Sequence, residues 1–131
     1  MAATNDLATE LAAAIAVTLR SAVGTAAVIK AYGSVVGLDG MHVIDASEPA
    51  YESRDLATWA RNVVEFALEN AQDAMAEITT EPWPWTTATV PRGALAAEPQ
   101  VQIVGDVIRC AYGQGAEAIR LRDVPIPRRH E

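Results

Sequence analysis

The chain has 131 residues and a formal net charge of −7 at pH 7, and 50% of its residues are hydrophobic although only 5% are aromatic. This length fits a single domain, 1–131, that can bury a core without a disulfide or a structural metal. The acidic balance argues against nucleic acid and membrane surfaces as partners, because both favour a basic protein surface.

The cysteine content and the hydropathy near the N-terminus bear on where the protein resides. Cys110 is the one cysteine, so no disulfide can form within the chain, and a reducing compartment is favoured. The apolar run at 11–19 follows Asp6 and Glu10 instead of basic residues and is cut short by Arg20. These features are not typical of a classical signal peptide or of a membrane span. We expect a protein of the cytoplasm or of a particle assembled inside the cell.

A helix is predicted over about residues 5–31. Large aliphatic side chains recur there at every fourth position, which places them on one helical face. They are Leu7, Leu11, Ile15 and Leu19. Asp6 and Glu10 suit the positive end of the helix dipole. Gly33 offers the left-handed backbone conformation that commonly ends a helix.

The segment GLDGMHVIDASEP, residues 37–49, spaces four polar residues three apart. They are Asp39, His42, Asp45 and Glu48. This spacing brings side chains together only on a helix, whereas the glycines favour a turn at Asp39-Gly40 and a short strand at 41–45, whose faces alternate. The four side chains then diverge, so no metal or acid–base site is predicted here. Asp45 or Ser47 is instead expected to cap the helix that follows.

A second helix is predicted over about residues 48–78. At 100° per residue its apolar side chains cover an arc of roughly 200°, about twice what one neighbouring element requires. They are Leu56, Trp59, Ala60, Val63, Val64, Phe66, Ala67, Leu68, Ala71, Met75 and Ile78. This helix should therefore pack between two elements, one of which could belong to another chain. With the first helix it should form a pair of long antiparallel helices joined by a short segment.

The opposite side of this helix carries an acidic stripe with residues four apart. They are Glu65, Glu69, Asp73 and Glu77. Such a stripe is usually a solvated face, and the alternative is an attraction for a basic partner.

Residues 79–100 read as a connector arm without clear periodicity, and four of the seven prolines fall there. Trp83 and Trp85 flank one of these prolines. In an extended segment two residues that are two positions apart point to the same side, so both indoles would face one surface. That surface is either the protein's own helices or a partner.

A β-hairpin is predicted at about 101–126, with a tail at 127–131. Apolar and polar residues alternate on both sides of 113–115, which is expected to be the turn, and Gly105 is expected to mark a bulge. A helix over 99–113 is the alternative, but its β-branched residues and internal glycine favour strand. Two strands alone are marginally stable, so this hairpin needs a third strand from 41–45, a helix or another subunit.

Neither a catalytic constellation nor a cofactor motif nor a metal site is predicted. Cys110 has no histidine near it in the sequence, and two histidines with one cysteine cannot supply an ordinary zinc site. The glycines at 113 and 115 lack the lysine and hydroxyl of a phosphate-binding loop. We therefore predict an α+β protein without catalytic residues, metal or cofactor, for which a non-enzymatic role is favoured over an enzymatic one.

The favoured function is a structural assembly subunit that homo-oligomerises or docks in a larger protein complex, for example a virion. The expected partner-binding residues are Trp59, Phe66, Trp83 and Trp85. The alternative is a small-ligand binding module or small enzyme whose pocket lies between the helices and the hairpin and uses His42, Cys110 and Tyr112. A third hypothesis is an adaptor that binds a basic partner through the acidic stripe, with an affinity that falls steeply with salt.

Overall fold

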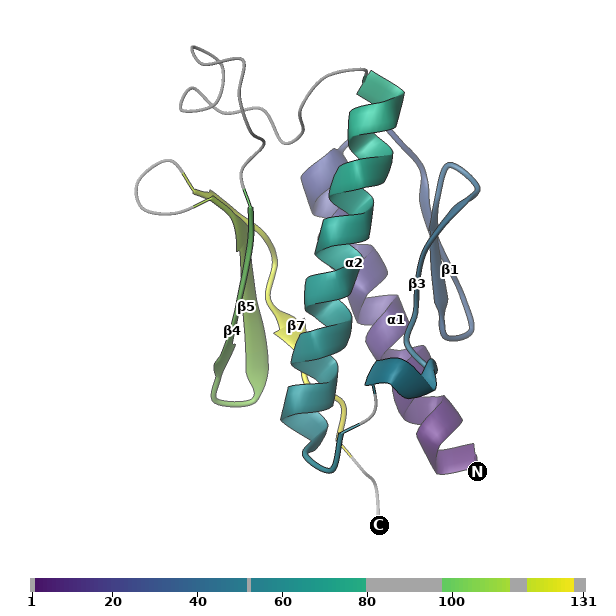
Figure 1. Cartoon of the computed structure of the whole chain (residues 1–131), viewed down its shortest axis with the longest axis vertical. Helices are drawn as coiled ribbons and strands as arrows, with labels where there is room; N and C mark the ends of the chain where they lie inside the picture. The colour runs from purple at the N-terminus through teal and green to yellow at the C-terminus, as the bar shows by residue number, and fades with distance from the viewer. Residues whose placement is uncertain (1, 52, 80–97, 114–117, 129–131) are drawn as a thin grey trace.

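The computed structural model describes residues 2–51, 53–79, 98–113 and 118–128. In these ranges the protein is α+β, with two α-helices and two antiparallel sheets (Figure 1). The elements in chain order are α1 (Ala2–Val23), β1 (Ile29–Tyr32), β2 (Val35–Leu38), β3 (Met41–Asp45), the 3-10 helix η1 (Pro49–Tyr51), α2 (Leu56–Thr79), β4 (Pro99–Val104), β5 (Val107–Tyr112), β6 (Ile119–Arg120) and β7 (Val124–Pro125).

The two helices lie between the two sheets (Figure 1). Sheet A has the strand order β1-β2-β3, and sheet B has the order β4-β5-β6 with β7 also paired to β5. Contacts follow this layering, since α1 touches β1, β2 and β7 while α2 touches β3 and β4. Each sheet therefore has an inner face toward the helices and an outer face turned away from them.

The first helix is shorter than the predicted 5–31. It ends at Val23, and Gly24, with φ 59°, donates its amide to the Arg20 carbonyl at 3.0 Å, which is a left-handed helix cap. The predicted helix over 24–31 is wrong because this stretch leads into β1, whose backbone pairs with β2. Gly33, predicted to end the helix, has φ 58° in the turn between β1 and β2 instead.

The two helices run in the same direction, as the colour gradient shows (Figure 1). In the chain the three antiparallel strands of sheet A lie between α1 and α2. An odd number of antiparallel strands returns the chain to the end of the molecule from which α1 started. The predicted antiparallel helix pair is therefore wrong.

The second helix begins at Leu56, eight residues later than predicted, and Asp55 caps it. The Asp55 carboxylate accepts hydrogen bonds from the Thr58 amide at 3.2 Å and the Thr58 hydroxyl at 2.6 Å. These bonds hold the pKa of Asp55 below its ordinary value. Asp45 and Ser47, predicted as caps, lie ahead of η1 and bond to each other.

The wide apolar arc of α2 is accounted for within the chain. Its members pack against α1, β3 and β4, as an arc of this width predicts for a helix between two elements. Residues of the arc that are buried are Trp59, Ala60, Val63, Val64, Ala67, Leu68, Ala71 and Met75. Leu56 and Ile78 are partly buried, and Phe66 is exposed over 44% of its surface.

Sheet B has a turn that the sequence did not predict, ahead of the expected one. The residues predicted as strands on either side of 113–115 pair as β5 and β6, Tyr112 with Ile119. Val104 pairs with Val107, so the connection between β4 and β5 runs through Gly105, whose φ of 63° suits a turn and not the bulge that the sequence predicted. The alternative helix over 99–113 is wrong, because these residues form β4 and β5. The strand at 41–45 exists as β3 but joins sheet A, while β6 and β7 supply the further strands of sheet B.

The buried apolar residues form one cluster that includes both helices and the inner faces of both sheets. In sheet B the inward residues of β5 are Ile108, Cys110 and Tyr112. Neither α1 nor α2 has an apolar stretch long enough to cross a bilayer, a finding that covers the described residues only.

Candidate functional site

The outer face of sheet A is built by the alternation of its strands. Ile29, Val36, Leu38 and Ile44 are buried on the side of the helices. Because side chains alternate along a strand, Lys30, Val35 and Gly37 point away from the helices. The register pairs Lys30 with Gly37 and Gly37 with His42, which sets these three residues in a row across the sheet. Tyr32 and Val35 form the adjacent pair on the same face.

A groove with a volume of ≈ 800 Å³ lies on this outer face. Its lining includes Lys30, Tyr32, Val35, Gly37 and His42. Gly37 explains the hollow, because the middle strand has no side chain at the point where its neighbours carry Lys30 and His42. A Cβ at Gly37 would approach only the Met41 carbonyl oxygen, at 3.5 Å, which is ordinary van der Waals contact.

Two apolar side chains beside the groove face solvent. Val28 is 58% exposed and Tyr32 is 63% exposed. The position of Val28 is fixed, because its amide donates to the Asp39 Oδ1 at 2.7 Å and its carbonyl accepts from the Asp39 amide at 2.9 Å. Asp39 and Gly40 have φ values of 49° and 83°, as the predicted two-residue turn requires. The groove therefore has a rigid apolar margin.

A hydrogen-bond cluster stabilises one end of sheet A. The Asp45 Oδ1 accepts from the Ser34 hydroxyl at 2.7 Å, the Ser47 hydroxyl at 2.7 Å and the Ser47 amide at 3.0 Å. Partial burial raises the pKa of Asp45, but the hydrogen bonds from Ser47 and Ser34, with the nearby His42, outweigh it and hold the pKa below its ordinary value. Asp45 is thus an ionised structural acceptor.

The structure does not bring together the three residues of the predicted pocket. His42 lies on the outer face of sheet A, whereas Cys110 and Tyr112 lie on the inner face of sheet B, on the far side of the helices. Burial, and secondarily Asp123, raises the pKa of the Cys110 thiol to about 12, so the reactive thiolate is scarce.

Tyr112 is fully buried, and its hydroxyl donates to the Leu68 carbonyl of α2 at 2.7 Å. Burial, and secondarily Cys110, raises the pKa of its phenol. This side chain fills the space between the helices and sheet B, where the predicted pocket was expected.

The expected partner-binding residues have different environments. Trp59 is 7% exposed and belongs to the core. Phe66 is on the surface, where its ring lies 5.2 Å from that of Tyr51 between centroids, at a tilt of 40°. Trp83 and Trp85, together with most of the connector arm, lie outside the described residues.

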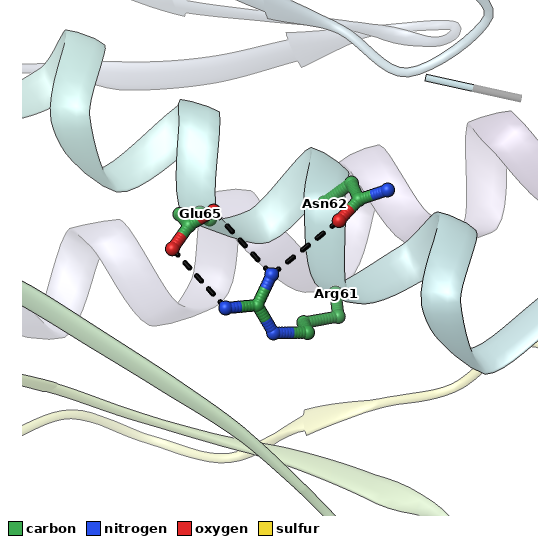
Figure 2. Close-up of polar contacts among 3 residues, drawn as sticks. All are labelled: Arg61, Asn62 and Glu65. Atoms are coloured by element: carbon green, nitrogen blue, oxygen red, sulfur yellow. Dashed lines mark hydrogen bonds and ion pairs between the residues drawn. The ribbon is translucent and has the colours of Figure 1, made fainter.

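The four carboxylates of the acidic stripe on α2 differ in exposure and in pairing. Glu65 is partly buried and pairs with Arg61, whose Nη2 lies 3.2 Å from the Glu65 Oε2, and Arg61 also contacts Asn62 (Figure 2). Glu69, Asp73 and Glu77 are exposed. Over the part of the chain that the structure describes, no group of three or more His, Cys, Asp and Glu residues is placed to hold a metal ion.

Sequence reasoning missed the outer face of sheet A. Three of its residues, Lys30, Tyr32 and Val35, lie in or directly after a segment predicted as helix. A signal was present, because hydrophobic and polar residues alternate through Ile29-Lys30-Ala31-Tyr32, and Gly33-Ser34 suits a two-residue turn.

No protein-family model matches the chain, and neither a curated protein nor a solved structure gives a significant match. The outer face of sheet A is therefore the basis for inferring the function.

Proposed function

We propose that the protein is a non-enzymatic assembly subunit that binds another protein through the outer face of sheet A. The observation that carries this proposal is the pair of exposed apolar side chains, Val28 and Tyr32, beside a groove whose floor is Gly37. Exposed apolar groups around a concave surface are typical of protein interaction sites. Tyrosine in particular combines a large apolar area with low conformational entropy.

The chemistry of the side chains supports binding over catalysis. The thiol of Cys110 is buried and its pKa is raised to about 12. The Oδ1 of the Asp45 carboxylate accepts hydrogen bonds from two serines. The described lining of the groove that holds His42 contains neither a cysteine nor a serine, and its carboxylate, Asp39, accepts a hydrogen bond from the Val28 amide.

The residues that line the groove indicate which chemical groups a partner would place in it. An apolar side chain of the partner fills the space above Gly37, and Lys30, the one lysine of the chain, favours an acidic group at the rim. The complex would be a self-assembly or a larger heteromeric particle. With its single buried cysteine, we place it in the cytoplasm or in a particle assembled inside the cell.

Self-assembly is tested first, by light scattering on the full chain over a concentration series at two salt levels. We expect a stable multiple of 13.9 kDa. Gly37→Val fills the groove with a residue that suits a strand, and it should return the mass to that of a monomer. Ala13→Leu is the matched control, because it enlarges an exposed side chain on α1 outside both sheets, and it should leave the mass unchanged.

A wild-type monomer at every concentration would contradict self-assembly. The heteromeric form then predicts that a photo-crosslinker at Tyr32 gives a discrete protein adduct in cells, whereas one at Val17, an exposed residue of α1, does not. Equal labelling from both positions, or an adduct that persists in the Gly37→Val background, would reject sheet A as the docking face.

A further inference from the structure

The outer face of sheet B carries a different set of side chains from that of sheet A. Because Ile108, Cys110 and Tyr112 point inward, Arg109 and Ala111 point outward. The register sets Gln102 opposite Arg109, and it sets both Gln100 and Arg120 opposite Ala111. Two arginines and two glutamines therefore share one face of three neighbouring strands.

A second groove, with a volume of ≈ 510 Å³, lies on this face. Its lining alternates between long and short side chains. Arg109, Arg120, Gln100 and Gln102 supply the long ones, whereas Ala111 and Ala118 supply short ones. The groove is therefore a shallow channel edged by guanidinium and amide groups.

This groove is basic although the protein as a whole is acidic. No carboxylate is among its described lining residues. Arg109 and Arg120 are exposed and form no ion pair with any residue that the structure describes, in contrast to Arg61 and Arg128, which pair with Glu65 and Asp106.

The nearby acidic groups lie outside the groove lining. Asp106 is bound by Arg128 at 2.7 Å. Glu98 precedes β4 and Asp123 precedes β7, and both are exposed. Arg122 is exposed as well, so within the described residues 98–113 and 118–128 three arginines and two carboxylates remain outside ion pairs.

We propose that the outer face of sheet B binds an acidic, extended segment of a partner protein. A guanidinium group binds a carboxylate in a bidentate manner, and two of them on adjacent strands match carboxylates that alternate along an extended chain. The glutamine amides can donate to, and accept from, the backbone of the same segment. A short acidic segment contacts only this local face, whereas a nucleic acid would also meet the negative charge of the remaining surface.

This inference is independent of the docking face proposed on sheet A, and its test uses a defined probe. The probe is a fluorescein-labelled peptide of eight glutamates, and its anisotropy is measured against the full chain at low salt. The wild type should bind it with an affinity that falls as salt is added. The double variant Arg109→Glu with Arg120→Glu should bind at least about tenfold more weakly.

The matched control is the triple variant Arg54→Glu with Thr9→Glu and Thr25→Glu, which changes the net charge by the same amount at exposed sites outside both sheets. It should retain binding to within about twofold. The neutral variant Arg109→Gln with Arg120→Gln keeps the test valid if charge reversal disturbs folding, which circular dichroism reports. It should weaken binding by a smaller factor in the same direction.

Three results would overturn the inference. The first is no binding of the peptide by the wild type at low salt. The second is an equal loss of binding in the control variant at Thr9, Thr25 and Arg54, which would indicate a general charge effect. The third is tighter binding of an eight-nucleotide oligothymidylate than of the peptide, which would assign the face to nucleic acid.

Discussion

The two sheets are built alike on the inside and differently on the outside. Each is antiparallel, and each turns buried aliphatic residues toward the same pair of helices. Their outer faces share no such constraint, so sheet A presents Tyr32 and Val28 around Gly37, while sheet B presents Arg109 and Arg120. The core therefore specifies the residues on one face of each strand and leaves those on the other face free for recognition.

The sheets also differ in how they are attached to the helices. Sheet B is held by buried groups, above all Tyr112, whose hydroxyl reaches α2. Sheet A receives two side-chain hydrogen bonds from the helices, from the Asn70 Nδ2 to the Val43 carbonyl at 2.7 Å and from the Arg20 Nε to the Ile29 carbonyl at 3.1 Å. Its own end is stabilised by the bonds from Ser34 and Ser47 to Asp45. Substitutions in the two sheets should therefore change the free energy of unfolding by different amounts and with a different dependence on pH.

The largest effect is expected in sheet B. Tyr112→Ala removes a fully buried aromatic ring and should lower the free energy of unfolding by about 3–5 kcal/mol, as measured by urea denaturation. Tyr112→Phe keeps the ring and loses the hydroxyl, and it should lower the free energy of unfolding by about 1–2 kcal/mol. If both variants cost the same, the hydrogen bond to Leu68 and not the ring would be the main anchor of sheet B.

A smaller, pH-dependent effect is expected in sheet A. Since the pKa of Asp45 is lowered in the folded state, its contribution is present above the ordinary value of 3.8 and is lost as the pH falls through the folded-state value. Asp45→Asn should cost about 1 kcal/mol at pH 7 and progressively less in the acid range. Urea titrations at pH 7 and below pH 4 measure this difference.

Asp73→Asn, which removes an exposed carboxylate from α2, serves as the control. A cost for Asp45→Asn that stays constant down to low pH would show that the Ser34 and Ser47 bonds do not depend on the ionised form.

The local signals of the sequence predicted the turn at Asp39-Gly40, the strand at 41–45 and the buried side of α2, because each depends on residues close together in the chain. The end of α1 was missed, since the alanine-rich stretch after Gly24 has high helix propensity, and only its pairing with 35–38 makes it a strand. The start of α2 was placed too early although Asp55 and Thr58 form a capping signal.

The candidate site could not be predicted because its residues meet only through strand pairing. Lys30, Gly37 and His42 come from three strands, and their row follows from a register that includes a shift between Val36 and Gly37. The same holds for Arg109 and Arg120. His42 and Cys110 were assigned to one pocket because of their chemistry alone. In the structure the two helices lie between the sheets that carry them.

The smallest expected effect on stability is that of Gly37→Ala, and this variant tests whether the outer face of sheet A is a recognition surface. Gly37 has no left-handed backbone, and a Cβ there meets only the Met41 carbonyl oxygen at 3.5 Å. Gly37→Ala should therefore raise the free energy of unfolding by about 0.5 kcal/mol, since alanine reduces the entropy of the unfolded chain. If Gly37 is kept for recognition, the same variant should weaken docking at sheet A while it stabilises the fold. A stability loss measured by urea denaturation would instead mean that Gly37 meets a local steric need, and the groove would then be a by-product of strand packing.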